Sequence, residues 1–238
     1  MTKSVRVEPE AYRGAIICDF DATITTDDVC DALMKAFSDD RWRNIGKRYL
    51  KGELSHQELN EKFVSFLDAT PGQIDKFISL NISVRPGFNS FVEYCYANDY
   101  ALFIVSSGWD YYIKKILAKF EKIQLLSVDN LSKIRGRRLF IICNKIRYLE
   151  DTRGWKIKSP SFPISFQSVP DKKFILISLK GLKYSPIVVI GDSMNDLKVA
   201  LTADKVFARG ELADLCERNG IHYKRFETFY DVIKGLNT

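Results

Sequence analysis

Three short runs of almost entirely apolar residues constrain this chain most, because each is too short for a typical buried helix and each ends in polar residues. They span residues 14–20, 100–105 and 186–190. Apolar runs without polar alternation are typical of strands that are buried on both faces of a parallel sheet. Plausible helices follow the second and third runs. This alternation predicts an α/β fold, with a Rossmann-like parallel sheet flanked by helices.

Residues 27–85 interrupt the alternation of strands and helices. Their apolar residues recur at helical spacing and show little strand character. Ser55 and Glu58 form a capping box that opens one helix. We therefore predict an all-helical cap at residues 27–85, inserted into a catalytic core made of residues 1–26 and 86–238.

A second departure from the alternation, at residues 131–168, contains the main concentration of charge. Residues 138–148 and 155–158 resemble the two strands of an antiparallel β-ribbon. The segment 131–160 holds nine Lys or Arg against two acidic residues, which makes it +7 in a chain whose net charge is +6. A solvated surface is the simplest interpretation. Steering of an anionic substrate comes next, and nucleic acid is not an expected partner because the segment shows neither an interleaved platform of stacking aromatics nor a known binding module.

The cysteines and the lengths of the apolar runs indicate where in the cell the protein is found. Five cysteines are scattered without a CxxC pair, which argues against a disulfide framework and a structural zinc site. No apolar run approaches the roughly 20 residues that span a bilayer, and the first residues lack the apolar segment of a signal peptide. We expect a cytoplasmic protein with no membrane partner, and the oligomeric state is left open.

Paired carboxylates lie at the end of the first apolar run and just after the third. Asp19 and Asp21 are two residues apart at the end of the first, so they point the same way while the strand lasts. Two such charges are costly unless a cation or proton compensates them, and Mg²⁺ with oxygen ligands is a natural solution. Asp192 and Asp196, after the third run, are four residues apart. One of them can ligate a metal while the other holds a neighbour in place.

Groups suited to phosphate lie at the second run and before the third. Ser106, Ser107 and Gly108 are small residues that can expose backbone N–H groups as an anion-binding nest. An ordinary turn with serine as a helix cap is an equally good interpretation of these three residues alone. Lys172 and Lys173 open the helix before the third run, and either can reach a phosphate as a point charge.

The joint pattern is more specific than its parts. Three buried strands end in Asp-x-Asp-x-Thr, in Ser and in Gly-Asp-x-x-x-Asp, with a lysine before the last. This order resembles the haloacid dehalogenase superfamily of phosphohydrolases, over nearly the whole chain from Gly14. The resemblance implies Asp19 as the nucleophile and Asp21 as the general acid/base. It implies that Asp192 completes a Mg²⁺ site with Asp19 and the carbonyl oxygen of Asp21.

The resemblance implies further roles. Ser106, Ser107, Gly108 and Lys172 would bind the phosphoryl group. Three residues would support the site: Thr23, Asn195 and Asp196. The helical segment resembles the cap of the phosphoserine phosphatase branch, and within that branch the likeness is closest to the enol-phosphate phosphatases of methionine salvage. Residues 85–88, 106–110, 206–209 and 226–231 carry this likeness. Asp28 falls where the branch has an acidic cap residue near the substrate.

These implications give a functional expectation with two alternatives. We expect a Mg²⁺-dependent phosphomonoesterase that hydrolyses a small phosphorylated metabolite through an aspartyl-phosphate. A phosphotransferase or phosphomutase would keep every motif and differ only in the group that accepts the phosphoryl group. A non-catalytic protein that binds RNA or another anion through the basic segment 131–160 is the alternative from another class.

Overall fold

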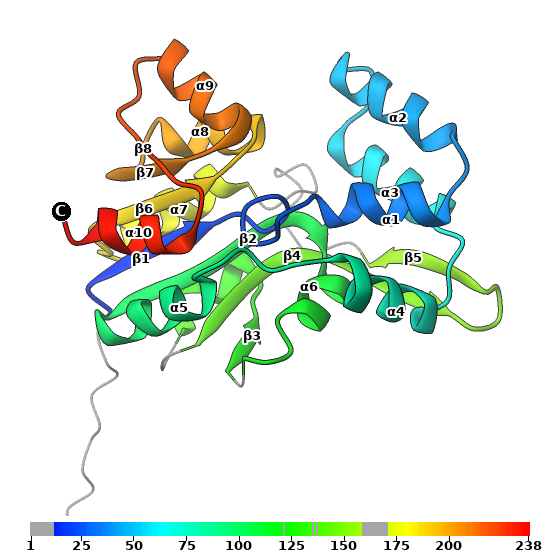
Figure 1. Ribbon diagram of the computed structural model, residues 1–238, viewed down its shortest axis with the longest axis horizontal. Coiled ribbons are helices and arrows are strands. Elements are labelled where there is room, and N and C mark those ends of the chain that lie inside the picture. Colours follow the sequence, from blue (N-terminus) through cyan, green and yellow to red (C-terminus); the bar gives the residue numbers. More distant parts are fainter. Residues whose placement is uncertain (1–11, 121, 135, 137, 159–170) are drawn as a thin grey trace, which may run out of the picture.

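The computed structural model describes residues 12–120, 122–134, 136, 138–158 and 171–238. Its centre is an eight-stranded sheet of order β3-β4-β2-β1-β6-β7-β8, with β5 paired to β4 (Figure 1). Every pair along this order is parallel, and only β4–β5 is antiparallel. The predicted α/β fold is therefore confirmed. The strands are β1 (Gly14–Cys18), β2 (Tyr100–Trp109), β3 (Ile123–Leu125), β4 (Leu139–Leu149), β5 (Gly154–Lys158), β6 (Ile187–Gly191), β7 (Lys205–Ala208) and β8 (Lys224–Arg225).

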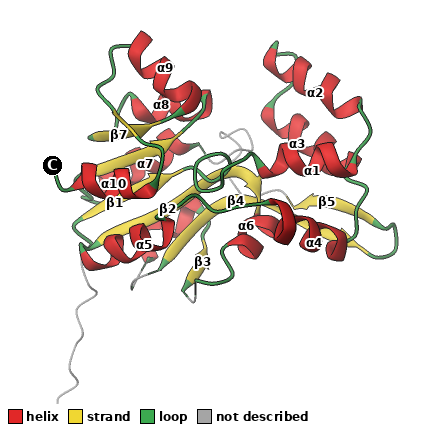
Figure 2. Ribbon diagram, viewed as in Figure 1, coloured by secondary structure: helices red, strands yellow, loops and turns green. Residues whose placement is uncertain are grey.

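Apolar cores lie on both faces of the sheet, which explains why its central strands are apolar at every position. In β1, Ile16 and Cys18 belong to one core, whereas Ala15 and Ile17 belong to the other. Helices cover both faces (Figure 2). The first core is covered by α5 (Phe88–Ala97), α6 (Asp110–Ile116) and α10 (Phe229–Leu236). The second is covered by α7 (Lys172–Gly181), and α8 (Leu197–Ala200) and α9 (Gly210–Arg218) pack beside β7.

Four helices occupy the segment between β1 and α5. They are α1 (Val29–Phe37), α2 (Arg41–Leu50), α3 (His56–Phe66) and α4 (Pro71–Asn81). Both α3 and α4 begin with a complete capping box, at Ser55 and Thr70. An antiparallel bridge between Thr25 and Val84 joins the two ends of the segment. Its division from the core as a separate cap, at residues 27–85, stays a prediction.

The β-ribbon is present, but its first strand has a second role. Arg147 pairs with Lys156 in the antiparallel ribbon. The earlier part of β4 pairs in parallel with β2 and β3, so residues 139–142 belong to the central sheet rather than to an excursion from it. These four residues are apolar and buried on both faces, which favours a central strand. Arg135, Arg137 and residues 159–168 of the expected excursion lie outside the described residues.

Candidate active site

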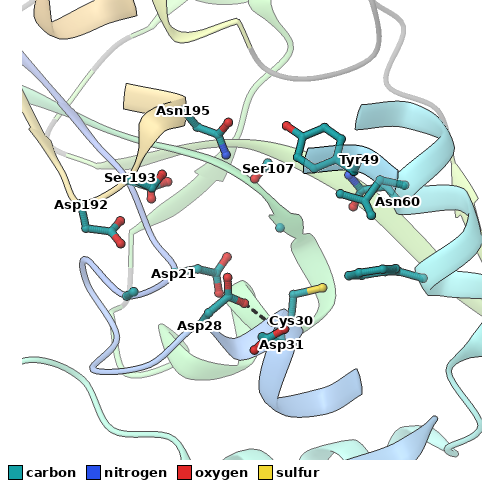
Figure 3. A pocket seen from close by; sticks show the side chains of 15 residues that line it. Asp21, Asp28, Cys30, Asp31, Tyr49, Asn60, Ser107, Asp192, Ser193 and Asn195 are labelled. Atoms are coloured by element: carbon teal, nitrogen blue, oxygen red, sulfur yellow. Dashed lines mark hydrogen bonds between the residues drawn. The ribbon is translucent and has the colours of Figure 1, made fainter. Parts of the chain in front are cut away.

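The candidate site residues gather where β1, β2 and β6 end, at the middle of the sheet. Parallel neighbours place their carboxyl ends at one edge, where ligands bind in open α/β sheets. A cavity of about 230 Å³ opens there between the sheet and the helical segment. Figure 3 shows Asp21 between Asp192 on the sheet side and Tyr49 and Asn60 on the helical side.

Three carboxylates lie together at the strand ends, and two of them, Asp19 and Asp192, line this cavity. Oxygen atoms of Asp19, Asp192 and Asp196 lie within 4.8 Å of one another. The Nζ atom of Lys172 is 2.7 Å from Asp19 Oδ1 and 2.6 Å from Asp196 Oδ1. Lys172 is buried, whereas Lys173 is exposed, so only Lys172 reaches the carboxylates.

The charges of this cluster do not balance. Burial, followed by repulsion from Asp19 and Asp196, raises the pKa of Asp192 to about 8. Burial also raises the pKa of Asp196 to about 6, against the attraction of Lys172. Three clustered carboxylates, two buried and one half-buried, with one ammonium group fit a further cation, and an all-oxygen donor set suits Mg²⁺.

Asp21 stands apart from the three clustered carboxylates. Its Oδ2 atom accepts hydrogen bonds from the Tyr112 hydroxyl at 2.7 Å and from Ser106 Oγ at 3.3 Å. Its Oδ1 atom accepts one from the backbone N–H of Val29 at 3.1 Å. Burial, followed by repulsion from Asp28, raises the pKa of Asp21 well above its ordinary range. This environment favours a protonated carboxyl group.

The expected turn after Val105 is not where the sequence predicts it. Strand β2 continues through Ser106, Ser107 and Gly108 to Trp109, with a shift of register against β4. The N–H of Gly108 donates to Ser106 Oγ at 2.9 Å, so this N–H of the expected nest has an internal partner. Ser107 and Gly108 still line the cavity.

Thr23 and Asn195, expected to support the site, and Asp28, expected near the substrate, lie at or near the cavity. Thr23 is buried, and its Oγ1 donates to Asp192 Oδ1 at 2.9 Å. Asn195 and Asp28 line the cavity. The Asp28 carboxylate also accepts the N–H of Asp31 at 2.8 Å and so caps α1.

Two arginines with no role assigned from the sequence hold the turn after Asp21. Ala22 has a φ of 54°, which is strained for a residue with a Cβ atom. Its carbonyl oxygen accepts hydrogen bonds from Arg85 Nη2 and from Arg209 Nη1, both at 2.8 Å. Arg85 Nε also donates to the carbonyl of Thr23 at 2.8 Å. Both arginines lie in stretches that carry the family resemblance, which is the only sequence signal that could have pointed to them.

A wall of helix α3 faces the strand ends across the cavity. Leu59, Asn60 and Phe63 line it, and they come from successive turns of one helical face. Asn60 Oδ1 accepts a hydrogen bond from the indole N–H of Trp109 at 3.0 Å. This bond ties the helical wall to the end of β2.

The comparison with protein families agrees with this geometry. The model of the haloacid dehalogenase-like hydrolases matches residues 16–201, and the chain belongs to this family. A relative from Exiguobacterium, named 2-hydroxy-3-keto-5-methylthiopentenyl-1-phosphate phosphatase, is 30% identical over 229 residues, covering 93% of this chain and 98% of its own. A relative of the same name from Brevibacillus brevis is 31% identical over 222 residues, covering 93% and 94%. The expected enzyme class, a phosphoric monoester hydrolase, is confirmed.

Solved structures agree in fold. A phosphoserine phosphatase with a phospho-aspartyl intermediate analogue superposes with a TM-score of 0.64 at 17% identity, covering 94% of this chain and 98% of its own. A substrate-bound phosphoserine phosphatase gives a TM-score of 0.65 at 17% identity, covering 94% and 99%. Among the described residues, no helix has the length and apolar character needed to cross a bilayer.

Proposed function

We propose that this chain is a Mg²⁺-dependent phosphomonoesterase that hydrolyses a small phosphorylated metabolite through an aspartyl-phosphate on Asp19. The observation that carries the proposal is the position of the Asp19 carboxylate. It lines the cavity, with the Lys172 ammonium group 2.7 Å away and Asp192 beside it. A nucleophilic carboxylate beside cationic groups is the arrangement that phosphoryl transfer needs.

The cation would be held by the carboxylates of Asp19 and Asp192 and by the carbonyl oxygen of Asp21. Asp196 supports this site through its contact with Lys172 at 2.6 Å and its acceptance of the N–H of Asp192 at 3.3 Å. When bound, Mg²⁺ offsets negative charge on the phosphoryl oxygens. The raised pKa of Asp192 supports this assignment, because its carboxylate lacks sufficient compensating charge in the protein alone.

The side chains divide the chemistry between them. An oxygen of Asp19 attacks phosphorus, and the bond from phosphorus to the ester oxygen breaks. Asp21, protonated at this step, gives its proton to the leaving oxygen. Asp21 then takes a proton from the water that attacks phosphorus, which frees Asp19 and releases inorganic phosphate. Lys172 and the end of β2 stabilise charge on the phosphoryl oxygens.

The α3 wall bears on the substrate. Leu59 and Phe63 offer apolar surface opposite the strand ends, and Cys30 of α1 also lines the cavity. Such a surface suits a leaving group with an uncharged, apolar portion. The substrate in the relatives' name, 2-hydroxy-3-keto-5-methylthiopentenyl-1-phosphate, has such a portion in its methylthio group. We therefore propose this ester as the first candidate substrate.

Release of inorganic phosphate tests the proposal. The wild-type protein is incubated with the candidate ester and a panel of small phosphomonoesters, with Mg²⁺ or with EDTA. We expect release only with Mg²⁺, and a loss of at least about 10³-fold in Asp19→Asn, because the nucleophile is gone. Formation of a new phosphate ester on an added acceptor alcohol, without release of inorganic phosphate, would indicate a phosphotransferase. No release from any ester by folded protein would reject the proposal.

A further inference from the structure

Tyr112 contacts the proposed acid/base directly, although its residue type and position suggest only core packing. Its side chain is 0% exposed, and its hydroxyl donates to Asp21 Oδ2 at 2.7 Å. Together with Ser106 Oγ and the Val29 N–H, it gives the Asp21 carboxyl group donors on both oxygens. The three donors come from α6, β2 and α1. Rotation of this carboxyl group therefore requires breaking bonds to three separate elements.

Gly108 provides the space that the Tyr112 hydroxyl occupies. A Cβ atom at position 108 would lie 1.7 Å from the Tyr112 hydroxyl oxygen and 2.6 Å from Asp21 Oδ2. Both distances are far below any allowed contact, so only glycine permits the pair to meet here. The φ angle of Gly108 is not positive, so its backbone lies outside the left-handed region. The glycine at this position is therefore required by the close approach of Tyr112 rather than by its own conformation.

Packing holds the Tyr112 ring in place. The ring centroid lies 6.0 Å from that of Phe20 and 6.1 Å from that of Trp109. Trp109 is fully buried, and its indole N–H is bonded to Asn60. A ring enclosed in this way keeps its hydroxyl at one point.

We propose that Tyr112 is a positioning residue for the reaction. Its hydroxyl orients the Asp21 carboxyl group toward the leaving oxygen, and the absence of a side chain at Gly108 leaves the space that this contact needs. The inference rests on the proposed function, in which Asp21 donates the proton. Misalignment of a proton donor affects esters whose leaving group needs protonation, and spares esters whose leaving group departs as a stable anion. The dependence on leaving group therefore separates positioning from a merely structural role.

Tyr112→Phe keeps the ring and removes only the hydroxyl. The value of kcat/KM, which reports on steps up to formation of the aspartyl-phosphate, is measured with an alkyl phosphate and with p-nitrophenyl phosphate. We expect a loss of about tenfold or more with the alkyl ester and of less than about twofold with p-nitrophenyl phosphate. An equal loss with both esters, or no loss with either, would overturn the inference.

Gly108→Ala is the second variant, and it should show the same dependence on leaving group because the added methyl group displaces Tyr112. Tyr111→Phe is the matched control. Its hydroxyl lies on the same helix but donates to Asp75 Oδ1 at 2.9 Å, away from the cavity lining. Its ratio of the two kcat/KM values should equal that of the wild type. Absence of phosphate release by the wild-type protein would reject the proposed function and this inference together, whereas an unchanged ratio in Tyr112→Phe rejects only the inference.

Discussion

The two walls of the cavity differ in chemistry and in how they are built. The strand-end wall, formed by Asp19, Asp192 and Ser107, carries charge and hydrogen-bonding groups. The α3 wall, formed by Leu59, Asn60 and Phe63, carries no charge. The first is held by neighbouring strands and a buried lysine, and the second by packing of α3 against α2 and β5. The difference suggests that one wall performs the chemistry and the other selects the leaving group.

After Asp19→Asn, the largest effect is expected at the strand-end wall, from Lys172→Met. The substitution removes the Lys172 ammonium group, which lies 2.7 Å from Asp19 Oδ1 and 2.6 Å from Asp196 Oδ1. We expect kcat/KM to fall by about 10²–10³-fold, because transition-state charge loses a donor. In EDTA, the free energy of unfolding should fall by about 3 kcal/mol, measured by chemical denaturation. Lys173→Met, on the exposed neighbour, is the matched control, and an equal loss there would contradict the assignment.

A second prediction concerns the pH dependence of stability without metal. The pKa of Asp192 rises from its ordinary value of 3.8 to about 8 in the folded protein. The folded state therefore binds a proton that the unfolded state releases between these values, so stability should decrease as pH rises through this window. Thermal unfolding in EDTA should show this decrease in stability. Added Mg²⁺ should restore stability most at the high-pH end of the window. A slope of the same size in Asp192→Asn would show that another group is responsible.

A smaller and more selective effect is expected at the α3 wall, from Phe63→Ala. Loss of this ring removes apolar surface from the cavity, so kcat/KM for an ester with an apolar tail should fall by about tenfold. Activity on a very small phosphomonoester should change by less than about threefold. Phe66→Ala is the matched control, because Phe66 lies on the same helix and packs under Arg41 instead of lining the cavity. Equal losses for both esters would contradict the idea that the α3 wall selects the leaving group.

The smallest effect is expected outside both walls, on the β-ribbon. Arg147 and Lys156 are paired in register and exposed. In the double variant Arg147→Gln, Lys156→Gln, kcat/KM at low salt should fall by less than about threefold, and at high salt it should not change. Kinetics at the two ionic strengths would check this. A large loss at both would instead make the ribbon a third part of the site.

Much of the fold and of the site can be predicted from the sequence because the signals are local. The apolar runs of β1, β2 and β6 identify central strands, and their order brings Asp19 and Asp192 to one edge. Ser55 and Thr70 begin helices through contacts within one turn. Such signals depend on neighbours in the chain, so periodicity and spacing are sufficient to read them.

Other features depend on contacts between distant segments. Arg85 and Arg209 meet at the carbonyl of Ala22, although 63 and 187 residues separate them from it. The continuation of β2 past Val105 and the double pairing of β4 also follow from neighbours that arrive from elsewhere in the chain.

The sequence by itself determined the parallel sheet, the helical segment and the set of acidic residues at the strand ends, because burial and chain order specify these. Only the tertiary structure decided between Lys172 and Lys173, since adjacent residues on a helix point in different directions and packing of α7 selects which is buried. It alone separated Asp21 from the clustered carboxylates and joined it to Tyr112. The physical reason is that a side chain's partner is set by packing in three dimensions, which local sequence patterns do not encode.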